Sequence, residues 1–281
     1  MRTTMTTDPQ PTLPFPTTAV TVPWDLRVPE ADIYLVGFGM QLPNDFTLEM
    51  LAVLKRCTRV FAVPPIHAPD FGLPPMEDLS RLYGPAKDRR LTYREWTGLI
   101  LDAAATAPPV AFATYGSVMC GASTPHQILQ QAPGRGLSVH VTKTVSCFDG
   151  IWADLNMDPF YGLSVWEASV FLDLAITPDT KANLLLPQAP VLGISQGPDL
   201  ATGTIAGSST ITQLRDHLLG FYPPEHPVYF IHTASGTSTG TEIETMPLVK
   251  LDHPGMQSHS TLLVPRLNAP AHLDYRPVPA S

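Results

Sequence analysis

Apolar residues in the first half of the chain fall into short runs that are separated by helix-like segments. The buried runs predict strands at 33–36, 59–63, 110–114 and 137–141. Between the first two strands, residues 46–56 place Leu48, Leu51 and Ala52 at the spacing of one helix face. A strand–helix–strand unit of this kind crosses over in the right-handed sense and builds a parallel sheet. The pattern therefore predicts an α/β fold.

A longer helix is predicted to begin near Tyr93. Thr92 precedes it, and Glu95 follows Thr92 at the spacing of a capping box. The apolar face of this helix is expected to consist of Trp96, Leu99, Ile100 and Ala103. A further helix is predicted after Ser123-Thr124-Pro125, with the proline at its first position.

The second half of the chain has its predicted strands closer together. Strands are expected at 191–195, 228–233, 241–246 and 261–264, with one helix at 208–221. Such dense strands late in the chain predict a second, partly antiparallel sheet. We place a boundary near residues 142–145, which gives an N-terminal α/β lobe at 30–142 and a C-terminal α/β lobe at 143–267.

Both ends of the chain are rich in proline and lack a periodic apolar pattern. Residues 1–29 are dominated by threonine and proline, and residues 268–281 are similar. Segments of this composition bury too little apolar surface to offset the entropy of ordering them. We therefore expect residues 1–29 to be a flexible extension or a surface strap, and 268–281 to be a tail.

Composition narrows the class of protein. The chain has a formal net charge of -8 and a pI near 5.5, so it lacks the basic footprint of a nucleic-acid-binding protein. Its three cysteines are far apart, which supports neither a disulfide framework nor a zinc site. No apolar run is long enough to span a bilayer or to serve as a signal peptide. We expect a cytoplasmic protein with no metal, nucleic-acid or membrane partner.

A glycine turn follows the first predicted strand. Gly37 and Gly39 stand between that strand and a helix, where glycine allows a cofactor to approach the backbone. A purely structural turn is the alternative. The dinucleotide-binding fingerprint is excluded, because its third glycine is missing and residues 60–63 at the second strand lead into prolines rather than to an acidic residue.

Three regions of the chain together resemble a known family. They are the Val36-Gly37-Phe38-Gly39 turn, the set Tyr83, Arg89 and Tyr93 followed by Tyr115-Gly116-Ser117-Val118, and the serine turn Ser146-Cys147 before Ala153-Asp154-Leu155. In this order and spacing they resemble the tetrapyrrole methylase superfamily, and within it the borosin-type peptide-backbone N-methyltransferases. The resemblance covers roughly residues 31–267.

This resemblance implies a two-lobed αβα fold with S-adenosylmethionine bound in the cleft between the lobes and S-adenosylhomocysteine as product. The homodimer usual in the family is expected as well. The residues expected to bind the cofactor are Val36, Gly37, Phe38, Gly39, Gly116, Ser117, Val118, Ser146 and Cys147.

The resemblance also assigns catalytic roles. A backbone amide nitrogen is a poor nucleophile because its lone pair is delocalised into the carbonyl group. We expect Tyr83 and Arg89 to activate the amide, with the arginine stabilising negative charge on oxygen. Tyr93 is expected to orient the amide and Tyr115 to contact its carbonyl or the cofactor methyl group. Simple packing and capping at a helix start is the alternative for the same side chains.

The substrate is expected to be a separate ribosomal precursor peptide, because the proline-studded end of the chain has few N–H groups to methylate. Two alternatives remain open. The same fold could methylate a tetrapyrrole or another small metabolite, or it could bind the cofactor without catalysis.

Overall fold

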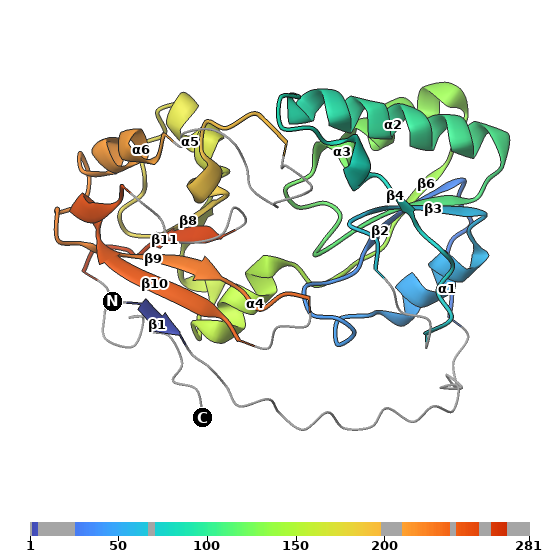
Figure 1. Ribbon diagram of the computed structural model, residues 1–281. Coiled ribbons are helices and arrows are strands. Elements are labelled where there is room, and N and C mark those ends of the chain that lie inside the picture. Colours follow the sequence, from blue (N-terminus) through green and yellow to red (C-terminus); the bar gives the residue numbers. More distant parts are fainter. Residues whose placement is uncertain are drawn as a thin grey trace.

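Two β-sheets covered by helices make up the computed structural model, which describes residues 2–4, 26–66, 71–197, 210–236, 240–252 and 260–268 (Figure 1). Each sheet has helices on both of its faces, so the layers follow the order helix, sheet, helix twice over. The two sheets have different strand directions.

The first sheet is parallel throughout and has the strand order β4-β3-β5-β2-β6. Its strands are β2 (Ile33–Gly37), β3 (Arg59–Val63), β4 (Glu77–Asp78), β5 (Val110–Thr114) and β6 (Val139–Val141). The central strands β2 and β5 are buried along their whole length. Parallel strands covered on both faces have such continuous apolar sequences, which is why these strands could be predicted.

Alternate residues of these strands point to opposite faces of the sheet. On one face Leu35 and Phe112 pack with Trp96 of helix α2 (Arg89–Thr106), beside helix α3 (Ser123–Gln131). On the other face Tyr34, Val36 and Ala111 pack against helix α1 (Leu48–Arg56).

Helix α1 presents a different face from the predicted one. Its buried residues are Met50, Val53 and Leu54, whereas Leu48 is 40% exposed. Thr47 caps the helix by accepting a hydrogen bond from the Met50 amide at 3.0 Å. The cap fixes the first turn, and packing against β2 and β3 buries a set of residues that is shifted by two positions from the predicted one.

Helix α2 begins at Arg89 rather than near Tyr93. Asp88 is the N-cap and accepts a hydrogen bond from the Arg90 amide at 2.8 Å. Thr92 is therefore buried inside the helix, and Glu95 pairs with Lys87 at 2.6 Å instead of closing a capping box. An aspartate can cap a helix as well as a threonine can, so the sequence contained two competing start signals.

Two smaller expectations about helices were also wrong. Leu99, predicted on the apolar face of α2, is 46% exposed. In α3 the N-cap is Ala122, without a side-chain hydrogen bond, and Pro125 is the third helical residue rather than the first.

The second sheet has the order β1-β10-β9-β11-β8-β7 and is antiparallel except between β7 and β8. Its strands are β1 (Arg2–Thr4), β7 (Leu163–Val165), β8 (Asn183–Pro187), β9 (Pro227–His232), β10 (Glu242–Pro247) and β11 (Thr261–Val264). Helices α5 (Ala168–Asp173) and α6 (Ile211–Leu218) cover one face, and α4 (Cys147–Asp154) covers the other. The expected mixture of strand directions is confirmed.

Three expectations for the second half and the ends need correction or fall partly outside the described residues. Residues 191–195 are not a strand, because a 3-10 turn at Ala189–Val191 precedes an irregular segment. Residues 2–4 of the predicted extension or surface strap form a strand that pairs with β10, and residues 1 and 5–25 of that segment lie outside the described part. Residues 208–209 of the predicted helix and residues 269–281 of the predicted tail lie outside the described part. The other 3-10 turns are Ser80–Leu82, Pro133–Arg135, Pro159–Tyr161 and Leu248–Lys250.

Candidate active site

A cavity of about 490 Å³ is lined by segments from both halves of the chain. All four residues predicted to be catalytic line it: Tyr83, Arg89, Tyr93 and Tyr115. Four residues predicted to bind the cofactor line it as well: Gly116, Ser117, Ser146 and Cys147. Residues that are far apart in the sequence, from 83 to 147, therefore line the same cavity.

The other five residues predicted to bind the cofactor do not line this cavity. Val36, Phe38 and Val118 have fully buried side chains in the core of the first lobe. Among the described residues that line the cavity, Met40 is present but Val36, Gly37, Phe38, Gly39 and Val118 are not. A cofactor contact from these five residues remains a prediction.

The two glycine turns hold each other in place. The Gly116 amide donates to the Gly39 carbonyl at 2.7 Å, and the Gly39 amide donates back at 3.3 Å. A Cβ atom on Gly37 would lie 2.4 Å from the Gly116 carbonyl oxygen. The absence of a side chain at Gly37 is therefore required by the close approach of the two turns.

Three aromatic rings form one side of the cavity. The ring centroids of Tyr83 and Trp96 are 5.0 Å apart, and those of Tyr93 and Trp96 are 5.3 Å apart. The Trp96 indole nitrogen donates to the Leu79 carbonyl at 2.9 Å, which fixes the ring on which both tyrosines rest. Edge-to-face and tilted contacts of this kind stabilise a defined arrangement of aromatic side chains.

The hydroxyl groups of Tyr83 and Tyr115 favour their protonated form. Burial raises the pKa of Tyr83 well above its ordinary value, and the neighbouring Tyr93 and Tyr115 hydroxyls add to the increase. Arg89 acts on this pKa in the opposite direction, as expected from the sequence, but its effect is the smallest. Burial also raises the pKa of Tyr115, although 52% of that residue is solvent-accessible, because it borders the cavity while protein surrounds its hydroxyl.

Arg89 lies where the two halves of the chain meet. Its amide donates to the Ser195 carbonyl at 2.9 Å, and the Gly197 amide donates to the Lys87 carbonyl at 3.1 Å. Within the described part of the chain, the guanidinium group of Arg89 forms no ion pair. A cation that lines the cavity and is not neutralised by a carboxylate is available to an anionic or partly negative ligand atom.

The serine turn begins helix α4. The Ser146 hydroxyl and amide both donate to the Asp149 carboxylate, at 2.8 and 2.7 Å, which completes the helix cap. Cys147 follows, and burial raises the pKa of its thiol to about 11. The thiol is therefore neutral near pH 7 and contributes an uncharged wall to the cavity.

The second half supplies lining residues that sequence reasoning did not identify. They include Glu167, Gln188 and Gln196. The Glu167 side chain caps α5 by accepting from the Val170 amide at 2.9 Å. Gln188 has a φ of 63°, a left-handed conformation that nothing in the local sequence signals.

The model of one protein family, described as Tetrapyrrole (Corrin/Porphyrin) Methylases, matches residues 32–248. The chain belongs to the tetrapyrrole methylase family. This membership confirms the family predicted from the sequence and the enzyme class that follows from it, a methyltransferase. The cavity described above is therefore the candidate active site of a methylase.

Curated relatives place the chain near the borosin branch of this family. It is 25% identical over 261 residues to a methyltransferase and type III borosin cyclic peptide precursor from Anomoporia bombycina, covering 89% of this chain and 30% of that protein. It is 27% identical over 201 residues to the omphalotin A precursor methyltransferase of Omphalotus olearius, covering 69% and 47% of the two chains. The chain thus spans less than half the length of these two relatives.

Solved structures agree with the fold. The uroporphyrin-III C-methyltransferase of Thermus thermophilus superposes with a TM-score of 0.57 at 20% identity, covering 83% of this chain and 94% of that one. Another structure of that enzyme, complexed with S-adenosylhomocysteine, gives 0.56 at 17% identity over 82% and 96% of the two chains. The predicted two-lobed αβα fold is confirmed.

No group of three or more potential metal ligands occurs among the described residues. None of the described helices is both long enough and apolar enough to cross a membrane.

Proposed function

We propose that this chain is an S-adenosylmethionine-dependent methyltransferase that methylates backbone amide nitrogens of a separate precursor peptide. The observation that carries the proposal is the meeting of Tyr83, Arg89, Tyr93 and Tyr115 in one cavity. The similarity to the two borosin precursor methyltransferases supports a peptide as the methyl acceptor.

The cavity fits the cofactor in size and chemistry. Its volume lies within the range of roughly 300–1,000 Å³ that is usual for small-molecule sites. Ser117, Ser146 and Gln188 offer polar atoms, while Met40 and Cys147 offer apolar surface. When bound, S-adenosylmethionine supplies an electrophilic methyl group. The protein's own part is to bind it, exclude water and prepare the acceptor.

The tyrosines act on the acceptor amide as hydrogen-bonding groups. Because its pKa is raised, Tyr83 is protonated near pH 7 and can donate to the amide oxygen. Arg89 lies beside it and stabilises the negative charge that this oxygen gains as the nitrogen loses its proton. A cationic ligand in the cavity would also lower the pKa of Tyr83 and Tyr115 and so favour ionisation of one of them. That tyrosinate can then take the proton that the amide nitrogen loses.

Tyr93 and Tyr115 complete the acceptor site in this proposal. The Tyr93 ring rests on Trp96 and so offers a fixed hydroxyl for orienting the amide. Tyr115 precedes the Gly116 turn and approaches the amide carbonyl or the transferred methyl group. Alignment of the reacting atoms at close contact accounts for a large part of the rate in such transfers.

A methyl-transfer assay with competing acceptors tests the proposal. The chain is incubated with S-adenosylmethionine that carries an isotopically labelled methyl group, together with a pool of random synthetic peptides or with uroporphyrinogen III. Fragmentation by mass spectrometry should place the label on backbone nitrogens of peptides. Labelling of uroporphyrinogen III alone would instead favour a small-molecule acceptor. Cofactor binding without transfer to either acceptor would favour a non-catalytic protein.

The proposal includes a homodimer. Several large apolar side chains are exposed in one stretch of the chain: Phe160, Tyr161, Val165, Trp166, Val170 and Leu174. Phe160 is 96% exposed, and β7 lies at the edge of the second sheet. Exposed apolar patches of this kind mark interaction sites. Light scattering should give the mass of two chains, and Phe160→Glu together with Leu174→Glu should give the mass of one.

A further inference from the structure

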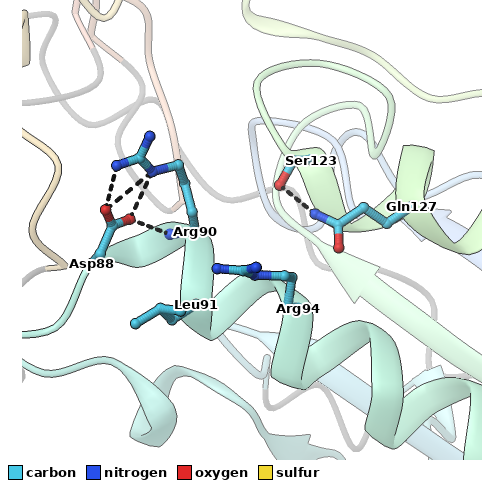
Figure 2. A pocket seen from close by; sticks show the side chains of 6 residues that line it. All are labelled: Asp88, Arg90, Leu91, Arg94, Ser123 and Gln127. Carbon is cyan, nitrogen blue, oxygen red and sulfur yellow. Dashed lines mark hydrogen bonds and ion pairs between the residues drawn. The ribbon is translucent and has the colours of Figure 1, made fainter.

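A surface groove of about 590 Å³ lies beside the cavity, over the first turns of α2 and α3. It is lined by Asp88, Arg90, Leu91, Arg94, Ser123 and Gln127 (Figure 2). Figure 2 shows the Arg94 side chain between two hydrogen-bonded pairs, Asp88 with Arg90 and Ser123 with Gln127. Neither the sequence prediction nor the family match assigns a role to these six side chains.

The groove and the cavity are lined by neighbouring residues of the same two helices. On α2, Arg89 and Tyr93 line the cavity, while Arg90 and Arg94 line the groove. Each pair is spaced four residues apart, so the two pairs form neighbouring stripes of the same helix. At the start of α3, Ala122 lines the cavity and the next residue lines the groove. An extended chain whose amide lies in the cavity can therefore continue into the groove.

The groove is cationic in an otherwise acidic protein. Its lining contains two arginines, Arg90 and Arg94, and one acidic residue, Asp88, a net charge of +1 against -8 for the whole chain. Arg90 is paired with Asp88. In the described part of the chain, no hydrogen bond or ion pair of the Arg94 side chain is found.

The remaining lining suits a peptide rather than a small anion. Leu91 is 46% exposed at the groove, which gives an apolar neighbour to the cation. The Gln127 amide nitrogen donates to the Ser123 hydroxyl at 3.2 Å. Its carbonyl oxygen accepts from the Thr97 hydroxyl at 3.2 Å and has a second lone pair for a further donor. Guanidinium, amide and leucine side chains in one groove match a polypeptide that carries a carboxylate beside backbone amides and apolar groups.

We propose that this groove binds an acidic side chain of the substrate peptide near the amide that is methylated, with Arg94 as its ion-pair partner. The inference rests on the proposed function, because it takes a peptide as the acceptor. Arg94 is then a specificity residue: it selects which peptides dock and in which register, and it does not touch the reacting atoms. Association of the peptide should weaken with salt, since the contact is exposed and electrostatic.

Selection from a display library of random peptides tests the inference. The wild-type chain, Arg94→Gln and Arg56→Gln are each used as bait with S-adenosylhomocysteine present. Arg56 is an exposed arginine at the end of α1, on the opposite face of the first sheet, and is the matched control. Wild type and Arg56→Gln should both enrich aspartate or glutamate at one peptide position, and Arg94→Gln should lose that enrichment.

The same selection tests the groove inference separately from the proposal that a peptide is the methyl acceptor. Peptides enriched without an acidic preference, or with the same preference in Arg94→Gln, would overturn the groove inference while leaving peptide binding intact. No peptide enrichment by the wild-type chain would count against the peptide as acceptor and would overturn both. As a second readout, a selected peptide and its Glu→Gln counterpart are compared by fluorescence anisotropy. We expect about a tenfold difference in Kd for wild type, equivalent to about 1.4 kcal/mol, and close to none for Arg94→Gln.

Discussion

Gly197 lies directly against the ring of Tyr83. A Cβ atom added to this glycine would be 2.8 Å from Cδ1 of the tyrosine, closer than side-chain atoms are normally found. The glycine belongs to the second half of the chain and is held there by its hydrogen bond to the Lys87 carbonyl at 3.1 Å. The position of a candidate catalytic side chain from the first half thus depends on a residue more than a hundred positions later.

Gly197→Ala should impair transfer without removing the cofactor site. The added methyl group must displace the Tyr83 ring, and small misplacements of catalytic groups are costly. We expect the methylation rate to fall by about tenfold or more, with S-adenosylhomocysteine affinity within about twofold of wild type. Gly98→Ala is the control, since nothing lies within 4 Å of a Cβ atom at that helical position. Equal rates for the two variants would contradict the role given to Tyr83.

Arg89→Ala should abolish turnover and leave cofactor binding nearly intact. The arginine is assigned to the negative charge that develops on the amide oxygen, an interaction made only during reaction. Single-turnover transfer to a peptide acceptor is the measurement. Retention of more than about a tenth of the wild-type rate, which means less than about 1.4 kcal/mol of barrier, would rule out this role. Arg135→Ala, which breaks an exposed pair with Asp102, should behave like wild type.

Tyr93→Phe removes one hydroxyl while keeping the ring that packs on Trp96. The aromatic cluster should therefore stay folded, and the near-ultraviolet circular dichroism should be unchanged. We expect loss of turnover by about a hundredfold if the hydroxyl orients the amide. A matched loss in Tyr161→Phe, which changes an exposed tyrosine away from the cavity, would show that the effect is not specific to the site.

Cysteine labelling reports whether a ligand fills the cavity. Cys120 is exposed and lines the cavity, whereas burial raises the pKa of Cys57 to about 12, which keeps that thiol unreactive near pH 8. Iodoacetamide should modify Cys120 first, and S-adenosylhomocysteine should slow this modification by about fivefold or more. Peptide mapping gives the rates. An unchanged rate of Cys120 modification at saturating S-adenosylhomocysteine would place the ligand elsewhere.

The folded protein should lose stability at high pH because of Tyr222. Its side chain is buried, its hydroxyl has no hydrogen-bond partner among the residues that the structure describes, and burial raises its pKa from 10.0 to about 12. Below about pH 10 the tyrosine is protonated in both states. Between pH 10 and 12 the unfolded chain loses the proton first, so the free energy of unfolding falls. Tyr222→Phe should remove this loss, which is on the order of 1 kcal/mol after allowance for solvent screening. Urea titrations near pH 9 and pH 11 measure it, and an identical decline in the variant would contradict the assignment.

Much of the fold could be predicted because local patterns and tertiary burial agree there. Strands β2 and β5 are buried along their length and β3 is buried at its centre, since both faces of a parallel sheet are covered. Helix boundaries were harder to predict, because Asp88 and Thr92 offered competing caps and only the contact with residues 195–197 favours the earlier one. The strand wrongly predicted at 191–195 shows the same limit: its apolar residues are buried by a turn.

The candidate site, like the fold, could be predicted only in part from the sequence. Residues in the order of a known family, such as Tyr83 and Arg89, could be located from the sequence. Gln188 and Gln196 could not, because they reach the cavity through a left-handed turn and an irregular segment whose positions depend on the second sheet. The turn at Gly37 was predicted correctly. The structure adds a packing reason for the glycine, because this residue lies against Gly116.

Calorimetric titration of S-adenosylhomocysteine into the wild-type chain and into Ser117→Trp tests the central claim most directly, because that claim requires one cofactor in this cavity. The account predicts one site per chain with a Kd in the micromolar range for wild type, and loss of binding in Ser117→Trp, whose bulky ring would occupy the cavity while circular dichroism stays unchanged. Absence of binding to wild type, or equal binding to both proteins, would contradict it.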